Sequence, residues 1–139
     1  MSGKLFFDTN ILIYAYDLDA AAKRERAMRV LHDAWENENG MLSTQVMQEF
    51  YVNVTRKIQR PIPPTKARRI LETYATWHVE VNGPHTIFMA SEIEERHRLS
   101  FWDSMIVAAA INGRAVKILT EDLNHGQVID GIEISDPFL

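Results

Sequence analysis

Cysteine is absent from this sequence of 139 residues, so neither a disulfide framework nor a thiolate metal site can form. Hydrophobic residues make up 46% of the chain and charged residues 24%, which is the composition of an ordinary globular protein. The length suits one compact domain with its own hydrophobic core. We therefore expect a single domain over residues 1–139.

Long apolar runs are also missing. The longest uncharged apolar stretch covers residues 105–111, far short of the roughly 20 residues that cross a bilayer. The N-terminal segment reaches the charge of Asp8 after only three apolar residues, which is not the apolar core of a signal peptide. We expect a soluble, cytoplasmic protein without a membrane partner.

Several motifs of well-known enzyme classes do not occur. The five histidines form no His-Glu-x-x-His pattern, and there is no phosphate loop or Gly-x-Gly-x-x-Gly fingerprint. No serine lies in a nucleophile-elbow motif. These absences disfavour zinc hydrolysis, loop-type nucleotide binding and serine hydrolysis.

The net charge of −4 argues mildly against a nucleic-acid partner, but the charge is unevenly distributed. Residues 50–71 contain no acidic side chain. The six positive charges of this segment, here called the basic strip, belong to Arg56, Lys57, Arg60, Lys66, Arg68 and Arg69. A solvated helix surface explains the strip as well as the functional alternative, which is a phosphate-contacting surface beside an acidic site.

Short strand-like runs alternate with amphipathic segments along the chain. Strands are expected at residues 4–7, 41–43, 77–81, 116–119 and 132–134, and helices at 10–16, 20–39, 44–58, 65–75, 85–99 and 101–112. Gly40 and Gly113 are expected to end the helices that precede them, Gly40 in a left-handed conformation. The alternation predicts an α/β domain with a mostly parallel sheet covered by helices on both faces.

Four acidic residues are expected at one edge of this sheet. Asp8 and Asp122 each follow a strand, and ligands of parallel sheets bind beyond the carboxyl ends of strands. Asp103 lies in the first turn of a helix, and Glu49 lies within two turns of the start of another. Right-handed crossovers would bring those first turns to the same edge.

Each acid also has a purely structural explanation. Asp8 could cap a helix, and Asp103 could complete a capping box with Ser100. Glu49 could be a solvated helix charge, and Asp122 a polar turn residue. For one acid alone the structural explanation is preferable. For four acids, each with apolar neighbours that place it near the core, a shared site is the better explanation.

Converging carboxylates without a balancing Lys or Arg in the same segments require a cation, because like charges at close range repel. Ligand sets made only of oxygen suit Mg²⁺ or Mn²⁺. Paired ions roughly 3.5–4 Å apart can activate a water and stabilise the leaving oxygen of a phosphodiester. The pattern therefore indicates phosphoryl hydrolysis. An aspartate-nucleophile phosphatase is disfavoured, because Asn10 stands where that chemistry needs a second acid.

Four sequence blocks in this order resemble the PIN-domain family over nearly the whole chain. They are Phe7-Asp-Thr-Asn10, Gln48-Glu-Phe-Tyr51, Ser100-Phe-Trp-Asp-Ser-Met-Ile-Val-Ala-Ala-Ala110 and Leu119-Thr-Glu-Asp-Leu-Asn-His-Gly126. Within that family the chain is most similar to the single-domain toxin ribonucleases of bacterial and archaeal toxin–antitoxin pairs, the VapC type.

The resemblance implies a five-stranded parallel sheet and an RNA-cleaving site that binds Mg²⁺ or Mn²⁺. It implies that the metal-binding and catalytic residues are Asp8, Glu49, Asp103 and Asp122. It further implies a homodimer and a cognate antitoxin whose tail occupies the acidic groove. The alternatives are a non-catalytic PIN-like module that binds RNA or protein, and a housekeeping RNA-processing nuclease.

Four residues beside the acids are candidates for orienting them by hydrogen bonds, namely Thr9, Asn10, Thr120 and Glu121. Spacing does not decide whether Glu121 or Asp122 is the metal ligand. Members of the family often have a further acid where Asn124 stands here, so the number of ions, one or two, stays open.

Overall fold

A computed structural model describes residues 3–139, so Met1 and Ser2, the first residues of the expected domain and of the N-terminal segment, lie outside the described part. Its sheet has six strands in the order β3-β2-β1-β4-β6-β5. They are β1 (Lys4–Phe7), β2 (Gly40–Ser43), β3 (His78–Glu80), β4 (Ala115–Leu119), β5 (Val128–Ile129) and β6 (Ile132–Ser135). Neighbouring strands are parallel except for β5 and β6. The predicted α/β class is confirmed.

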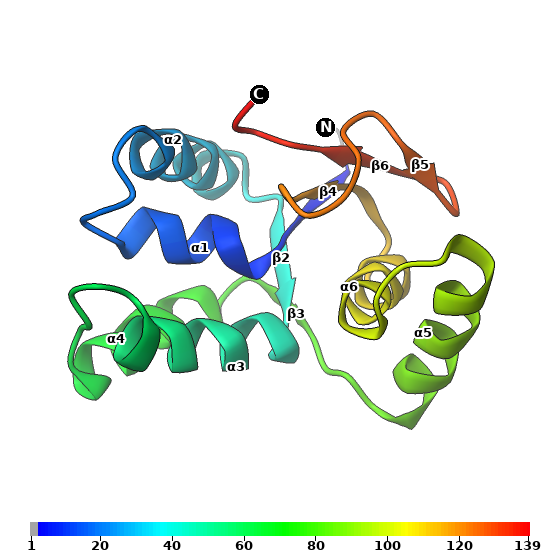
Figure 1. The fold of residues 1–139 in the computed structure, drawn as a ribbon, viewed down its shortest axis with the longest axis horizontal. Coiled ribbons are helices and arrows are strands. Elements are labelled where there is room, and N and C mark those ends of the chain that lie inside the picture. The colour runs from blue at the N-terminus through cyan, green and yellow to red at the C-terminus, as the bar shows by residue number, and fades with distance from the viewer. Residues whose placement is uncertain (1–2) are drawn as a thin grey trace.

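Helices cover the sheet on both sides, as predicted. They are α1 (Thr9–Tyr16), α2 (Ala22–Asn37), α3 (Thr44–Val52), η1 (Asn53–Lys57), α4 (Pro64–Tyr74), α5 (Pro84–His97) and α6 (Phe101–Asn112). Figure 1 shows α1 to α4 on one side of the strands and α5 and α6 on the other. No helix within residues 3–139 is both long enough and apolar enough to cross a membrane.

Polar side chains begin three of these helices at the expected places. Asp8 caps α1, Ser43 caps α3, and Ser100 caps α6 by accepting from the backbone N–H of Asp103 at 3.1 Å. These caps fix where the chain turns from strand or loop into helix. They also hold Asp8 and Asp103 at the N-terminal ends of α1 and α6.

The expectation that Gly40 ends the second helix in a left-handed conformation is wrong. The left-handed residue after α2 is Glu38, with φ of 53°, whereas Gly40 is the first residue of β2. Gly40 is needed for packing, because a Cβ there would lie 2.6 Å from the ring of Trp77. Gly113 ends α6 as predicted but keeps φ at −85°, and Arg114 takes the positive φ of 62°.

The predicted helix over residues 44–58 changes type partway. After Val52 it continues as the single π-turn η1, in which the N–H of Ile58 donates to the carbonyl of Asn53 at 3.1 Å. π-Turns of this kind occur frequently at functional sites. Sequence periodicity missed this change because it reports only which face of a helix is apolar.

The strand β5 was also missed, so the sheet is six-stranded rather than five-stranded. It is only two residues long and pairs antiparallel with β6 through a tight turn. Asp130 and Gly131 form that turn with φ of 48° and 85°. A run of two residues carries no alternation that could reveal it.

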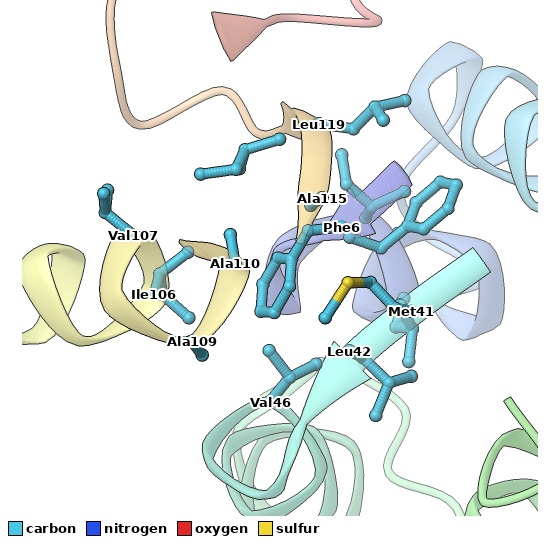
Figure 2. Close-up of a cluster of buried hydrophobic side chains, with 14 of the residues drawn as sticks. Phe6, Met41, Leu42, Val46, Ile106, Val107, Ala109, Ala110, Ala115 and Leu119 are labelled. Carbon is cyan, nitrogen blue, oxygen red and sulfur yellow. The ribbon is translucent and has the colours of Figure 1, made fainter. Parts of the chain in front are cut away.

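The core lies between the sheet and the two helical layers. Figure 2 shows Ile106, Ala109 and Ala110 of α6 beside the strands that carry Phe6 and Met41. Every residue from 104 to 110 is buried, which explains the apolar run in the sequence as a core helix. The buried position of α6 fixes its first turn, and therefore Asp103, against the edge of the sheet.

Candidate active site

Three of the four predicted acids meet at the carboxyl edge of the sheet. Asp8 follows β1, Asp122 follows β4, and Asp103 lies in the first turn of α6. One carboxylate oxygen from each lies within 4.8 Å of the other two. Glu49 of α3 is not part of this trio, but it lines the same cavity of about 410 Å³. All four predicted acids therefore belong to one site.

Asp8 is the most buried and the most firmly held of the acids. Its Oδ1 accepts from the backbone N–H of Thr9 at 2.7 Å, and its Oδ2 accepts from the hydroxyl of Thr120 at 2.8 Å. The same hydroxyl oxygen accepts from the N–H of Asp122 at 3.0 Å. Thr120 thereby couples the position of Asp8 to that of the loop after β4.

Two other predicted polar residues, Thr9 and Asn10, hold Glu49 and Asp122. The hydroxyl of Thr9 donates to Glu49 at 2.6 Å, and the amide of Asn10 donates to Asp122 at 3.1 Å. Gln45, which sequence reasoning missed, donates a longer bond of 3.4 Å to Glu49. Its position one helical turn before Glu49 was the signal that could have identified it.

Glu121 does not face the acid trio. Its carboxylate accepts from the hydroxyl of Tyr14 and from Lys23, both at 2.9 Å, on the side of α1 and α2. Asp122, held by Asn10, is the acid that faces Asp8 and Asp103. Sequence spacing could not distinguish Glu121 from Asp122. The directions of their side chains distinguish them, because Asp122 alone of the two points toward Asp8 and Asp103.

The structural explanation of Asp103 holds only in part. Ser100 accepts from the backbone N–H of Asp103, which is one half of a capping box. The reciprocal bond, in which the backbone N–H of Ser100 would donate to the Asp103 carboxylate, is not formed among residues 3–139. The Asp103 carboxylate is therefore available to the site while its backbone serves the cap.

Burial and mutual repulsion make the ionised trio unfavourable without a counterion. Burial raises the pKa of Asp8 to about 7, against the opposing effect of its hydrogen bonds from Thr120 and Thr9. Burial also raises the pKa of Asp103 and Asp122, and neighbouring carboxylates raise them further. A group of this kind holds either a proton or a cation. Its donors are all oxygens, which fits a hard divalent ion.

Of the six residues of the basic strip, one lines the acidic cavity. Lys57 of η1 lines the cavity. Arg60 instead forms an ion pair with Asp19 at 3.0 Å. The other members of the strip are exposed and do not line the cavity; they are Arg56, Lys66, Arg68 and Arg69. Lys57 is therefore the member of the basic strip that adjoins the acidic cavity.

The family model of the PIN domain matches residues 5–129. The chain belongs to the PIN domain family. No curated protein sequence matches it. The match covers all four acids, so the sequence resemblance to PIN domains is confirmed, and the four motif blocks lie within or beside the elements that form the acidic cavity.

Solved structures with the same fold include three from bacterial toxin–antitoxin systems. A toxin–antitoxin complex from Klebsiella pneumoniae has a TM-score of 0.72 at 20% identity, covering 96% of this chain and 98% of that chain. Mycobacterium tuberculosis VapC20, a sarcin–ricin loop cleaving toxin, has 0.66 at 21%, covering 86% and 90%. DNA-bound VapBC from Salmonella typhimurium has 0.66 at 19%, covering 98% and 99%. At these low identities, the TM-scores show a shared fold alone.

Proposed function

We propose that this PIN domain is a metal-dependent endoribonuclease that hydrolyses RNA phosphodiesters and acts as the toxin of a toxin–antitoxin pair. The observation that carries the proposal is the convergence of Asp8, Asp103 and Asp122 within 4.8 Å at the carboxyl edge of the sheet. Mg²⁺ or Mn²⁺ is the proposed ion, since both prefer oxygen ligands and accept substrate phosphate.

The four acids have different proposed roles. A divalent ion would supply Lewis acidity to the phosphate and acidify an attacking water. Asp8 and Asp103 are its principal ligands, and Asp8 also orients the water. Glu49, fixed by the short bond from Thr9, holds the ion or a water beside it. Asp122 completes the site, supported by Asn10.

The toxin role rests on the structural neighbours. The Klebsiella match comes from a toxin–antitoxin complex, the Salmonella match is DNA-bound VapBC, and VapC20 is a toxin that cleaves the sarcin–ricin loop. For this chain we infer an RNA substrate, an antitoxin partner, a homodimer and a cytoplasmic location. A non-catalytic module is disfavoured, because an unused acid cluster would retain its repulsion without any compensating function.

Incubation of the purified protein with total cellular RNA tests the proposed activity. New 5′ ends should appear in Mg²⁺ or Mn²⁺, and sequencing them identifies the cleaved RNA. Excess chelator should abolish cleavage. No histidine lines the described cavity and the sequence has no cysteine, so neither residue type is available there to cleave RNA without a metal ion. Undiminished cleavage in chelator would contradict a metal-dependent reaction.

Expression in a host cell without an antitoxin tests the toxin role separately. The wild-type chain should arrest growth, and Asp8→Asn at the same protein level should not, because the arrest depends on cleavage. Unimpaired growth with soluble protein that cleaves RNA in vitro would instead favour a housekeeping RNA-processing nuclease.

Replacing Lys57 by Ala should weaken RNA binding more than replacing Lys66. Lys57 lines the acidic cavity, whereas Lys66 is an exposed residue outside it. For single-stranded RNA, loss of one phosphate contact should reduce the slope of log K against log salt by about 0.7. Binding titrations over a range of salt concentrations measure this slope. An equal slope for wild type and Lys57→Ala would exclude the phosphate contact.

A further inference from the structure

The active-site cavity extends along one face of the continuous helix formed by α3 and η1. The residues that line it from this helix stand at positions i, i+3, i+4, i+7, i+8 and i+12, namely Gln45, Gln48, Glu49, Val52, Asn53 and Lys57. The α-helical part from Gln45 to Val52 extends about 10 Å along its axis, at about 1.5 Å per residue, and the π-turn carries the lining on to Lys57. The cavity is therefore a groove long enough for a few nucleotides.

The two ends of this groove differ in chemistry. At one end Gln45 donates to the backbone carbonyl of Trp102 at 3.3 Å, which places the first turn of α6 beside the start of α3. The side chain of Trp102 also lines the groove. At the other end lies the cation of Lys57. Glu49 lies between these ends, and Asp103 follows Trp102 in the chain.

The side chain of Trp102 is unusually exposed to solvent for a tryptophan. It is 62% exposed, although a buried indole stabilises a protein by more than almost any other side chain. The ring of Phe101 packs against it edge-on, with centroids 5.3 Å apart and planes at 76°. The first turn of α6 fixes its backbone. The exposed ring is thus anchored directly beside the proposed metal ligand Asp103.

We propose that Trp102 stacks on one unpaired base next to the scissile phosphate, while Lys57 contacts a backbone phosphate at the far end of the groove. This inference rests on the proposed ribonuclease function and deepens it by assigning how the substrate is held. Every base has a face that can stack on an indole, so Trp102 positions the strand without reading its sequence. A base inside a duplex is already stacked on its neighbours, so the groove selects an unpaired segment.

Short RNAs with one mapped cleavage site, each lacking a single base beside that site, test the proposal. With wild-type protein, one abasic position on one side should slow single-turnover cleavage at limiting protein by roughly tenfold or more, the range expected for loss of one base–aromatic stack. Trp102→Ala should slow cleavage of the intact RNA by a similar factor and should be insensitive to the same abasic position. Trp102→Phe should retain most of the sensitivity.

Phe88→Ala is the matched control, because Phe88 is an aromatic residue of α5 with 66% exposure that does not line the groove. It should cleave intact and abasic RNAs as the wild type does. Thermal melts check that Trp102→Ala remains folded, which its exposure leads us to expect. An abasic penalty that persists undiminished in Trp102→Ala would overturn the proposal, as would equal rates of Trp102→Ala and wild type on intact RNA.

A binding measurement separates this inference from the proposed function. Base stacking should quench the fluorescence of Trp102, so single-stranded RNA in chelator should quench wild type more than Trp102→Phe, which keeps Trp35 and Trp77. If the wild type cleaves no RNA in Mg²⁺ or Mn²⁺ but this difference in quenching is present, the proposed activity fails and the base-binding groove stands. Cleavage without any difference in quenching overturns the groove and leaves the activity intact.

Discussion

Asp103→Asn should lower the single-turnover rate of RNA cleavage by more than about 100-fold while the protein stays folded. Loss of a residue that merely supports a metal ligand typically costs 10- to 100-fold, and loss of a ligand itself should cost more. Asparagine has nearly the same size as aspartate. Its backbone N–H can still donate to the hydroxyl oxygen of Ser100, so the cap of α6 persists. Single-turnover assays at saturating Mg²⁺ or Mn²⁺ measure the loss, and circular dichroism verifies the fold.

Glu121→Gln is the matched control for this prediction. Glu121 adjoins Asp122 in sequence, but its carboxylate bonds to Tyr14 and Lys23 on the other side of the loop. The variant removes one acid from the same region and should keep activity within a few-fold of wild type. A larger loss for Glu121→Gln than for Asp103→Asn would show that the assignment of the acids is wrong.

Asp8→Asn should make the metal-free protein more stable at neutral and alkaline pH. The pKa of Asp8 is raised to about 7, so ionising it within the fold costs free energy that the unfolded chain does not incur. A shift of about three pKa units corresponds to as much as about 4 kcal/mol, and weaker hydrogen bonds to the neutral amide reduce the gain.

The stability gained by Asp8→Asn should depend on pH. Near pH 4 and below, the folded wild type keeps Asp8 protonated at little cost, so the variant should gain almost nothing. Between about pH 4 and pH 7 the folded state retains a proton that the unfolded state has lost, so the wild type becomes progressively less stable. Above about pH 7 the full difference in unfolding free energy between Asp8→Asn and the wild type should remain. Chemical denaturation in chelator at pH 4, 6 and 8 measures it.

A purely structural Asp8 predicts a different result. Asparagine caps helices about as well as aspartate, so a residue that only capped α1 would give no gain at pH 8. Added Mg²⁺ or Mn²⁺ should stabilise the wild type by mass action and the variant much less. Equal or lower stability of Asp8→Asn at pH 8 in chelator, with equal shifts in metal, would exclude the acid cluster as a metal site.

The sequence predicted the elements and the acids because both depend on local patterns. The turn from β1 to α1 at Asp8 and the cap of α6 at Ser100 follow from the types of residue at those positions. Three supporting residues, Thr9, Asn10 and Thr120, were also predicted, because each lies within two positions of a motif acid.

Features that depend on tertiary packing could not be read in this way. The direction of Glu121 is set by Tyr14 and Lys23, which lie about a hundred residues away in sequence. Gly40 is required by the ring of Trp77 rather than by a helix end. Arg60 of the basic strip pairs with Asp19, which lies 41 positions earlier in the chain, a contact that local charge patterning does not reveal.

The central claim is that the acid cluster binds a catalytic metal ion. Its most direct test is a titration with Mn²⁺ in which metal binding and RNA cleavage are both measured at each concentration. Calorimetry on chelator-treated protein should show saturable binding in the wild type and much weaker binding in Asp8→Asn and Asp103→Asn. The initial rate of RNA cleavage should rise over the same range of Mn²⁺ concentration as the binding. Binding that is unchanged in both variants, or cleavage that continues at full rate without bound Mn²⁺, would contradict the assignment of this acid cluster as a catalytic metal site.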